Sequence, residues 1–524
     1  MIQRRTATLG LAIGLAVGLL VACGQTPVER QPGTLIVGVQ SNPTVLDPRL
    51  AIDVASLHVI QLVYNRLIKK DPVGKLVCDL CSRWEQPAPT TYRFSLHRGV
   101  RFHDGQELTA EDVVYTFRSM RDPALQSPRR MTLAPIESIR AVDRYTVEFR
   151  LKEPYAPFLQ NMAVAIVPKH HAEGRPEAVV REPLGSGPFR FVAWKPDEHV
   201  LLEAFPDYWE GPARLKRILI KVIPDQTVRL LELEQGGVDL LINLVPPDSL
   251  PRLEQNPAVR IVTRPGSAFS YIGFNLEDPL LGRRRVRQAI AYAIDRRGII
   301  LNILKGLATP ARGLLPPTHW AYEHDVHTYP YDPEEARRLL DEAGLPNPPG
   351  PTPRFTLVYK TSMNEVRRRI GEILQAQLAE VGIRVVMKNY EWGTFYADIR
   401  RGNFQMYTLT WVGITDPDHY YYVFHSSSLP PRGANRNRYR NAEIDRLVEQ
   451  GRATVEPAAR RAVYSRVQKI VAEDLPYVPL WHALNVAVMR RELKGFVLYA
   501  NQDFSGLKGA YLETQDGAPV AAGR

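Results

Sequence analysis

A helix pattern that passes directly into a strand pattern near residue 382 most constrains the fold of this chain. Apolar side chains recur at helical spacing between Val366 and Val381, and Gly382 follows as a residue suited to end a helix. Ile383, Val385 and Met387 then alternate with other residues, as in a half-buried strand. A helix joined to a strand by one glycine predicts layers of helices packed on a sheet, that is, an α/β fold.

Similar patterns recur along the whole chain. Thr109, Asp225 and Asp332 are each suited to cap the start of a helix, and Asp332 is followed by proline at the first helical position. The predicted helices cover 109–117, 225–236, 286–294, 332–343, 366–381 and 457–471, and the predicted strands cover 35–39, 92–96, 145–151, 238–244 and 383–387. A length of 524 residues implies roughly three domains or lobes.

The N-terminus reads as an export signal. A basic segment, Met1–Arg5, precedes the uncharged apolar run Leu9–Val21, which is too short to cross about 30 Å of hydrocarbon as a helix. The run ends in Leu-Val-Ala before Cys23, which resembles a bacterial lipobox and implies cleavage there and lipidation of Cys23. Residues 1–22 are therefore predicted to be a signal peptide and residues 23–32 a polar tether. The alternative is an ordinary signal peptide that contains a chance cysteine.

Composition and motifs exclude several classes of function. The net charge is +11, but the basic residues are interleaved with acidic ones along the chain. Because no long basic run is combined with stacking aromatic residues, a nucleic-acid partner is not predicted. The sequence has no HExxH motif and no phosphate-binding loop, and Gly185-Ser186-Gly187 fits neither a dinucleotide fingerprint nor a nucleophile elbow. No catalytic residue, cofactor or metal site is predicted.

Three features leave alternatives open. Cys78 and Cys81 can form a structural disulfide, remain free thiols or serve metal or redox chemistry. A loop that carries His319, His324 and His327 is either solvated or a metal site. The aromatic residues at Trp411 and Tyr420–Tyr422 belong either to the edge of a core strand or to the wall of a ligand site.

Several motifs in one order resemble the extracellular solute-binding proteins of family five, the dipeptide, oligopeptide and nickel receptors of ABC importers. They span about Leu35 to Lys494. These motifs are Leu46-Asp47-Pro48, Val63–Leu67, Trp84-Glu85, Gly99–Gly105 with Leu108–Val114, Gly185–Phe189, Phe274-Asn275, Val286–Asp295, Tyr331-Asp332-Pro333 and Ala343-Gly344.

The resemblance implies a two-lobe periplasmic-binding-protein fold of type II, large cluster, with an additional inserted domain. Carried over to this chain, lobe I covers 33–70, 183–270 and 481–524, the extra domain covers 71–182, and lobe II covers 271–480. It also implies ligand contacts at these residues: Trp411, Gly413, Ile414, Asp416, Tyr420, Gly185, Ser186 and Gly187.

The resemblance further implies a lipid-anchored, exported, monomeric receptor that is not an enzyme. It would deliver a peptide-like solute to an ABC permease and its ATPase subunit. Peptide-binding relatives place an aspartate three residues after the tryptophan that corresponds to Trp411, where this chain has Ile414. The usual partner of a peptide amino terminus is therefore absent or moved to Asp416. Oligosaccharides, opines and chelated nickel remain alternative ligands, and a secreted lipid-anchored enzyme and an adhesive surface protein remain alternative functions.

Overall fold

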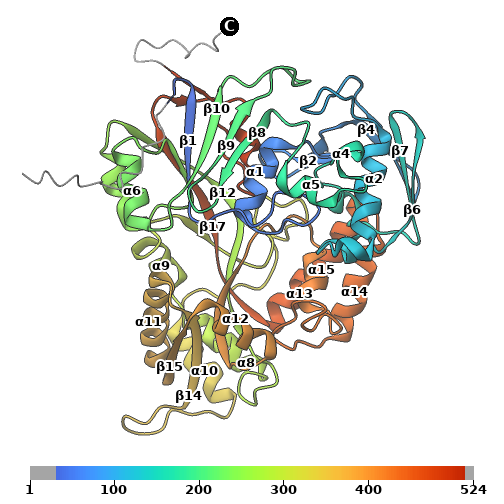
Figure 1. Ribbon diagram of the computed structural model, residues 1–524. Helices are drawn as coiled ribbons and strands as arrows, with labels where there is room; N and C mark the ends of the chain where they lie inside the picture. Colours follow the sequence, from blue (N-terminus) through green and yellow to red (C-terminus); the bar gives the residue numbers. More distant parts are fainter. Residues whose placement is uncertain (1–30, 514–524) are drawn as a thin grey trace, which may run out of the picture. The chain divides into compact units, whose positions relative to one another are not determined.

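The computed structural model describes residues 31–513, and the unit that begins at Gly33 is treated by itself. Strands and helices share this unit (Figure 1), and the predicted α/β fold is confirmed. Among the described residues, no helix combines the length and apolar character needed to cross a membrane.

The elements are as follows. The strands are β1 (Thr34–Val39), β2 (Ile68–Lys70), β3 (Leu76–Cys78), β4 (Cys81–Ala88), β5 (Thr91–Leu96), β6 (Ile136–Asp143), β7 (Thr146–Leu151), β8 (Phe189–Lys195), β9 (His199–Ala204), β10 (Arg217–Val222), β11 (Leu240–Ile242), β12 (Val259–Phe274), β13 (Ala308–Pro310), β14 (Phe355–Ser362), β15 (Ile383–Tyr390), β16 (Met406–Trp411), β17 (Tyr477–Arg490), β18 (Leu493–Lys494) and β19 (Tyr511–Leu512). The α-helices are α1 (Val54–Val63), α2 (Ala110–Arg121), α3 (Phe158–Asn161), α4 (Lys169–Ala172), α5 (Pro176–Arg181), α6 (Gln226–Glu234), α7 (Leu250–Glu254), α8 (Arg284–Tyr292), α9 (Arg296–Asn302), α10 (Pro333–Glu342), α11 (Glu365–Glu380), α12 (Trp392–Arg401), α13 (His419–Phe424), α14 (Ala442–Ala453) and α15 (Pro457–Asp474). Short 3₁₀ turns are η1 (Pro123–Leu125), η2 (Arg130–Leu133), η3 (Pro247–Ser249) and η4 (Phe504–Leu507).

Two long antiparallel strands, β12 and β17, connect the two halves of the main sheet. Within residues 31–513 this sheet has 11 strands in the order β15-β14-β16-β12-β17-β11-β1-β10-β9-β8, and β13 pairs with β17 as a branch. We call the strands on the β1 side, with their helices, lobe I, and those on the β14 side lobe II. The pairing of β12 with β17 is interrupted between Pro265 and Phe269. An irregular stretch of β12 backbone therefore faces β17 where the chain passes between the two sets of strands.

Lobe I is built around β1, which is buried on both faces. Leu35 and Val37 pack in one core with residues of α1, whereas Ile36 packs in a second core with residues of α6. Because β1 pairs in parallel with both β10 and β11, helices cover both faces of the sheet here. This explains why residues 35–39 are almost continuously apolar instead of alternating.

Lobe II has the same layered construction. β14 pairs in parallel with β15 and β16, and α11 packs one face of these strands through Ile370, Leu374 and Leu378. A second core on the other side joins α12, α13, α14 and α15. Gly382 takes a positive φ of 84° where α11 ends, which confirms the predicted helix stop before β15.

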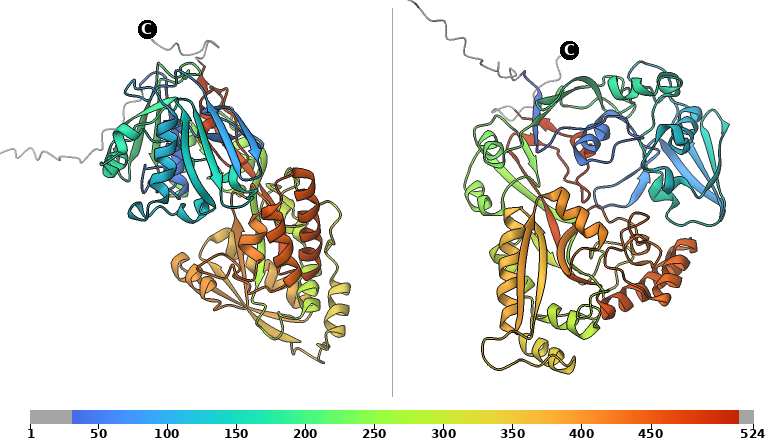
Figure 2. Two further views of the ribbon diagram at one scale, coloured as in Figure 1. Left: turned by 90° about the vertical axis from the view of Figure 1, so that its right-hand side faces the viewer. Right: turned by 60° about the horizontal axis from the view of Figure 1, so that its bottom comes forward.

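A separate four-stranded sheet, in the order β4-β5-β7-β6, lies beside lobe I (Figure 2). α2 packs on it through Val113 and Phe117, and together they enclose a core of their own. The β2–β3 hairpin, residues 68–78, leads into this sheet.

The helix caps predicted from the sequence are confirmed. Thr109 and Asp112 form a reciprocal capping box at the start of α2. The carboxylate of Asp225 accepts from Val228 N, and the carboxylate of Asp332 accepts from Glu335 N.

Candidate functional site

A cavity of about 420 Å³ lies where the β2–β3 hairpin, strand β12 and loops of both lobes meet. Its walls are formed by Val73, Gly74, Lys75, Leu76, Gln160, Gly266, Ser267, Pro316, Thr318, His319, Trp320, Ile414, Thr415, Ala500 and Asn501. This volume falls within the range of small-molecule sites, roughly 300–1,000 Å³. Two larger hollows, of about 650 and 860 Å³, are lined by lobe II residues alone. The smaller cavity is the candidate site because both lobes contribute to it.

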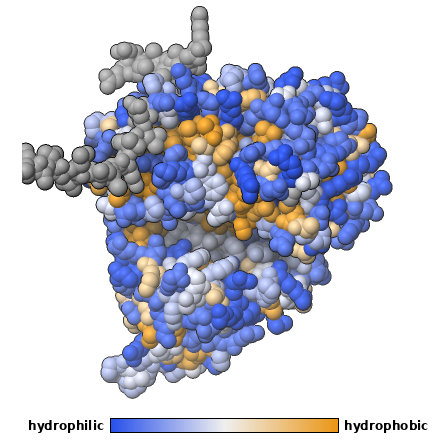
Figure 3. Space-filling model, viewed as in Figure 1, coloured by the Kyte–Doolittle hydropathy of each residue, from blue (hydrophilic) through white to orange (hydrophobic). Residues whose placement is uncertain are grey.

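The surface around the middle of the molecule is rich in apolar side chains. On the face in Figure 3, hydrophobic residues gather along a hollow that runs across this face. A hollow of this kind rimmed by polar residues is typical of a binding surface.

The irregular stretch of β12 forms the floor of the cavity. Ser267 N donates to Ala500 O over 3.3 Å, and Asn485 Nδ2 on β17 donates to the same carbonyl over 2.8 Å. A Cβ on Gly266 would lie 2.7 Å from Ala483 O, so only glycine fits this close approach of two backbones. The floor is therefore fixed to the joint between the lobes.

The lobe II wall is the loop that follows β16. Gly413 has φ +73° and turns the chain, after which Ile414 and Thr415 reach the cavity wall. Ile414 is 2% exposed and packs in the lobe II core, so its contact with the cavity is apolar. An isoleucine here offers no charge to a ligand amine.

Asp416, the second acid considered as an amine anchor, is paired with arginine. Its two oxygens accept from Arg460 Nη1 and Nη2 over 2.9 and 2.6 Å, and the two side chains are 13% and 6% exposed. The backbone N–H of Asp418 also donates to Asp416 Oδ1 over 2.8 Å. The carboxylate of Asp416 thus holds its own turn and α15 together.

Asp418 lies next to this pair and has a partner of its own. Its carboxylate is 3.0 Å from Arg452 Nε. Burial raises the pKa of Asp418 to about 6, and the attraction of Arg452 only partly offsets this. Neither acid of the Asp416-Pro417-Asp418 turn is among the residues that line the cavity.

Trp411 and Tyr420, the aromatic residues proposed from the sequence, pack in or against the second core of lobe II and are not among the residues that line the cavity. Trp411 lies against the guanidinium of Arg436, whose carbon is 4.4 Å from the ring centre, and meets the ring of His419 edge-on at 4.7 Å. Tyr420 is fully buried in the core of lobe II. Of the five residues proposed around Trp411, the structure brings Ile414 to the cavity, and the other four are not among its lining residues.

Gly185, Ser186 and Gly187 lie against the end of α1 instead of the cavity. Gly187 N donates to Val63 O over 2.8 Å, and a Cβ on Gly185 would come within 2.0 Å of that same oxygen. Ser186 Oγ donates to Asn65 Oδ1 over 3.4 Å. The structure therefore gives these three residues a packing role in lobe I.

The histidines of the 319–327 loop are dispersed. His319 lines the cavity, and burial lowers its pKa. His327 lies 3.2 Å from Tyr292 OH, and His324 meets the ring of Tyr322 edge-on. Over residues 31–513, no group of three or more His, Cys, Asp or Glu side chains has an arrangement that could hold a metal ion.

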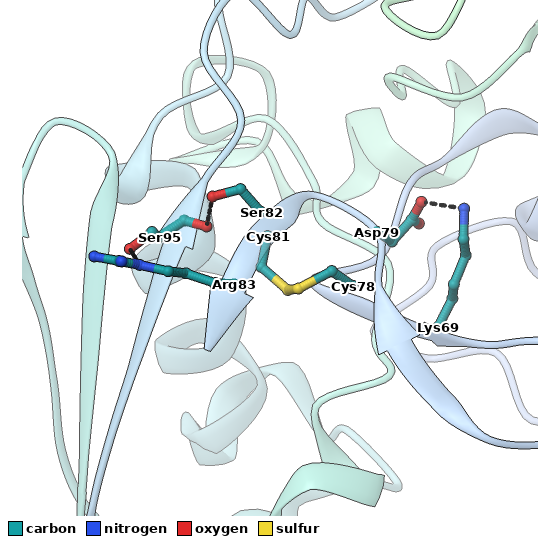
Figure 4. The surroundings of a disulfide bond; sticks show 7 residues. All are labelled: Lys69, Cys78, Asp79, Cys81, Ser82, Arg83 and Ser95. Carbon is teal, nitrogen blue, oxygen red and sulfur yellow. Dashed lines mark hydrogen bonds and ion pairs between the residues drawn. A yellow bond between two sulfur atoms is a disulfide. The ribbon is translucent and has the colours of Figure 1, made fainter. Parts of the chain in front are cut away.

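Cys78 and Cys81 are joined by a disulfide, with Cα atoms 5.1 Å apart (Figure 4). The bond lies between the end of β3 and the start of β4, where Lys69 Nζ also forms an ion pair with Asp79 Oδ1 over 2.9 Å. The disulfide therefore closes the short turn that leads from the hairpin into the four-stranded sheet. Cys23 lies outside the described residues.

The sequence patterns missed most of the hairpin wall. Lys70 Nζ donates to Thr415 Oγ1 over 2.6 Å, and Gln160 Nε2 donates to Thr415 O over 3.4 Å, so both reach the lobe II wall. β2 and β3 have three residues each, too few for an alternating pattern to stand out. The one available signal was the turn Asp71-Pro72-Val73-Gly74.

Comparison with known proteins agrees with this architecture. Residues 75–430 match the family described as bacterial extracellular solute-binding proteins, family 5 Middle. The dipeptide-binding protein of Escherichia coli K12 is 28% identical, with 92% of this chain and 96% of that protein covered. Heme-binding protein A of Haemophilus influenzae is 30% identical, covering 94% and 96%.

A solved structure has the same fold. The oligopeptide-binding protein AppA of Bacillus subtilis, in complex with a nonapeptide, is 30% identical with a TM-score of 0.77, and the match covers 92% of this chain and all of that one. Its likeness extends over both lobes and the separate four-stranded sheet. The two-lobe fold expected from the sequence is thereby confirmed.

Proposed function

This chain belongs to the bacterial extracellular solute-binding proteins of family 5, and we propose that it is the receptor of an ABC importer that captures a peptide-like solute between its two lobes. The observation that carries the proposal is the cavity walled by both lobes and floored by the irregular stretch of β12. A solute bound there contacts lobe I and lobe II at once, so it stabilises the closed arrangement. A membrane permease could then distinguish loaded from empty receptor.

The chemistry of the cavity fits a binding role without turnover. Its lining consists mainly of apolar, amide and hydroxyl groups, and burial lowers the pKa of the His319 side chain in it. The two relatives have nearly the same sequence identity to this chain, yet one is named for binding dipeptide and the other for binding heme. A peptide-like solute is our first choice, and an oligosaccharide or chelated nickel is the alternative for the same receptor role.

The place of action follows from the family and the N-terminal sequence. We propose that the chain is exported, processed before Cys23 and held to a membrane by acyl chains on that residue. Its partners would be a permease and an ATPase subunit, and the receptor would act as a monomer. A secreted enzyme is the lower alternative and would show turnover of a bound solute.

Native mass spectrometry of the purified protein tests the proposal. We expect one co-purifying solute per chain, released on denaturation with a peptide-like mass and fragmentation. Ala500→Trp, which fills the cavity from lobe I, should abolish co-purification. Val142→Trp, on the exposed face of β6, should retain it and serves as the matched control. Equal ligand content in both variants would contradict binding in this cavity.

A further inference from the structure

Lys70 is not itself among the residues that line the cavity, but its ammonium contacts one of them, Thr415. Lys70 is the last residue of β2 and pairs with Leu76 across the hairpin. Residues directly opposite each other on antiparallel strands point to the same face, and Leu76 lines the cavity. The side chain of Lys70 therefore follows the cavity-facing side of the hairpin and ends at Thr415, also a lining residue.

The ammonium of Lys70 has donors to spare. An ammonium carries three N–H donors, and among residues 31–513 Thr415 Oγ1 is the one acceptor within hydrogen-bond distance of it. No carboxylate of a described residue lies within ion-pair distance of Nζ. A half-buried ammonium normally has such a partner, because an unpaired charge is costly to remove from water.

The charged groups around Lys70 are already matched with one another. Asp503, at the start of η4, is bound by Arg66 Nη1 over 2.7 Å, and Asp416, after β16, is bound by Arg460. Burial lowers the pKa of His319, from the loop before Trp320. Asp503 and Asp416 are thus each paired with an arginine, and the carboxylate of Asp71 accepts from the backbone N–H groups of Val73 and Lys75, so none of these acids is paired with Lys70.

The cavity itself has no acidic wall. Among the described residues that line it, Lys75 is the one with a permanently charged side chain, and it belongs to the same hairpin as Lys70. The carboxylate that would hold a ligand amine is replaced by Ile414. Both the missing acid and the unmatched base favour a negatively charged group in the ligand.

We propose that Lys70 is the anchor for a carboxylate of the bound solute, and that this cavity selects peptide-like solutes by an acidic group and not by a free amino terminus. The inference rests on the proposed receptor function and specifies its ligand class. A carboxylate beside Nζ would accept a hydrogen bond from an N–H group that Thr415 leaves free.

The protonation of Lys70 supplies a specific signature of such binding. Burial, with a smaller contribution from Arg66, lowers the pKa of Lys70 to about 8, while Asp416 and Asp503 act in the opposite direction. At pH 8.5 a large share of the empty protein has a neutral amine at this position. A bound carboxylate favours the charged form, so binding at this pH should take up a proton.

Calorimetric titration of the mature chain tests the anchor. The ligands are di- to tetrapeptides, each as the free acid, the C-terminal amide and the N-acetylated acid. We expect amidation to weaken binding at least tenfold and N-acetylation to change it little. Lys70→Met should weaken binding of the acid by a similar factor and remove the preference for acid over amide. Lys195→Met, an exposed lysine on β8, is the control for net charge.

Titrations at pH 8.5 in two buffers with different ionisation enthalpies provide the second readout. We expect uptake of roughly half a proton or more per acid bound, and none in Lys70→Met. Lys70→Arg keeps a permanent charge, so it should keep the preference for the acid while losing the proton uptake. This variant separates the role of the charge from any effect of methionine on folding.

Two results would overturn the inference. If Lys70→Met weakens acid and amide equally, Lys70 serves only to hold Thr415 across the cavity, and the receptor function still stands. If the acid and the amide bind equally to the unmodified protein without proton uptake, the anchor lies elsewhere. Failure of every peptide to bind would instead overturn the peptide-receptor proposal and the inference with it.

Discussion

Replacing Asp416 by asparagine separates a structural carboxylate from a ligand-binding one. We predict that Asp416→Asn lowers the stability of the empty protein and leaves discrimination between free-amine and N-acetylated peptides unchanged. The reason is the ion pair with Arg460, in which both oxygens of Asp416 are used.

The magnitude follows from the burial of this pair. Arg460 is 6% exposed, and after the substitution its guanidinium keeps the carbonyl of Gly451 at 3.0 Å as a hydrogen-bond acceptor but loses its carboxylate partner. Removing one member of a buried ion pair costs about 3–5 kcal/mol. Asparagine keeps the shape of the side chain and one oxygen acceptor, so we expect a loss near the lower limit, about 3 kcal/mol.

Urea unfolding of the ligand-free protein measures this loss, and calorimetry with paired peptides measures ligand binding. Asp325→Asn is the matched control, because Asp325 pairs with Lys469 at the exposed surface and its loss should change stability little. Unchanged stability in Asp416→Asn, together with loss of binding for free-amine peptides only, would refute the structural assignment. It would also show that the amine anchor had moved to Asp416.

Four other predictions concern the N-terminus, the disulfide, the buried histidines and a contact between the lobes. Intact-mass measurement of membrane-fraction protein should show a lipid increment on a peptide that begins at Cys23, and Cys23→Ala should release the protein or stall its processing; an unmodified Cys23 in mature protein would contradict this. Thiol labelling of denatured, non-reduced protein should find Cys78 and Cys81 blocked, and reduction should cost on the order of 2 kcal/mol or less because the loop is small; two reactive thiols per mature chain would exclude the bond. Burial lowers the pKa of four histidines to about 4: His58, His103, His419 and His482. The free energy of unfolding should therefore fall between pH 7 and pH 5 by about 2 kcal/mol for each histidine, while Asp418, whose pKa is raised, adds back about 1 kcal/mol. A flat or rising urea midpoint over this range would contradict the burial of these rings. Asp248→Asn should weaken solute binding by roughly two- to fivefold without destabilising either lobe. The reason is that Asp248 of lobe I accepts a hydrogen bond from Arg369 of lobe II over 2.8 Å and lies 3.5 Å from Lys305. Equal affinity of the variant and the unmodified protein in a titration would show that this contact does not favour closure.

The sequence alone predicts the elements of the fold well where local signals agree. The helix that ends at Gly382 and the capped helix that begins after Asp332 combine apolar spacing with a start or stop residue, and both form as predicted. The run 35–39 was recognisable as a strand because burial on both faces leaves no polar position. Periodicity does not reveal that β12 and β17 belong to both lobes, because crossing from one lobe to the other changes their surroundings and not their period.

The candidate site was less predictable for a physical reason. Its walls come from six separated segments of the chain, and a segment that contributes only one to four residues leaves no periodic signal. Ile414 could be found because a motif with a known spacing passes through it. Lys70 could not, because its importance comes from what is missing around it, a carboxylate within reach of Nζ. The pairing of Asp416 with Arg460 joins residues 44 positions apart and is likewise visible only in three dimensions.

The contacts that connect the lobes bear on how a solute could control closure. Asp248 with Arg369, Lys70 with Thr415 and Gln160 with Thr415 all join the two sides of the cavity. The first is an exposed pair and the last is a long hydrogen bond, so each contributes little on its own. A backbone hydrogen bond from Ala156 N to Arg452 O over 2.7 Å is a further contact between the two sides. A ligand shifts the populations of open and closed arrangements by its preference for the closed one. A solute carboxylate would supply the missing partner of Lys70 through a charge-assisted contact. This contact would be available only when Thr415 has been brought to the hairpin. Recognition of the solute would thus be linked to closure through one side chain, Lys70.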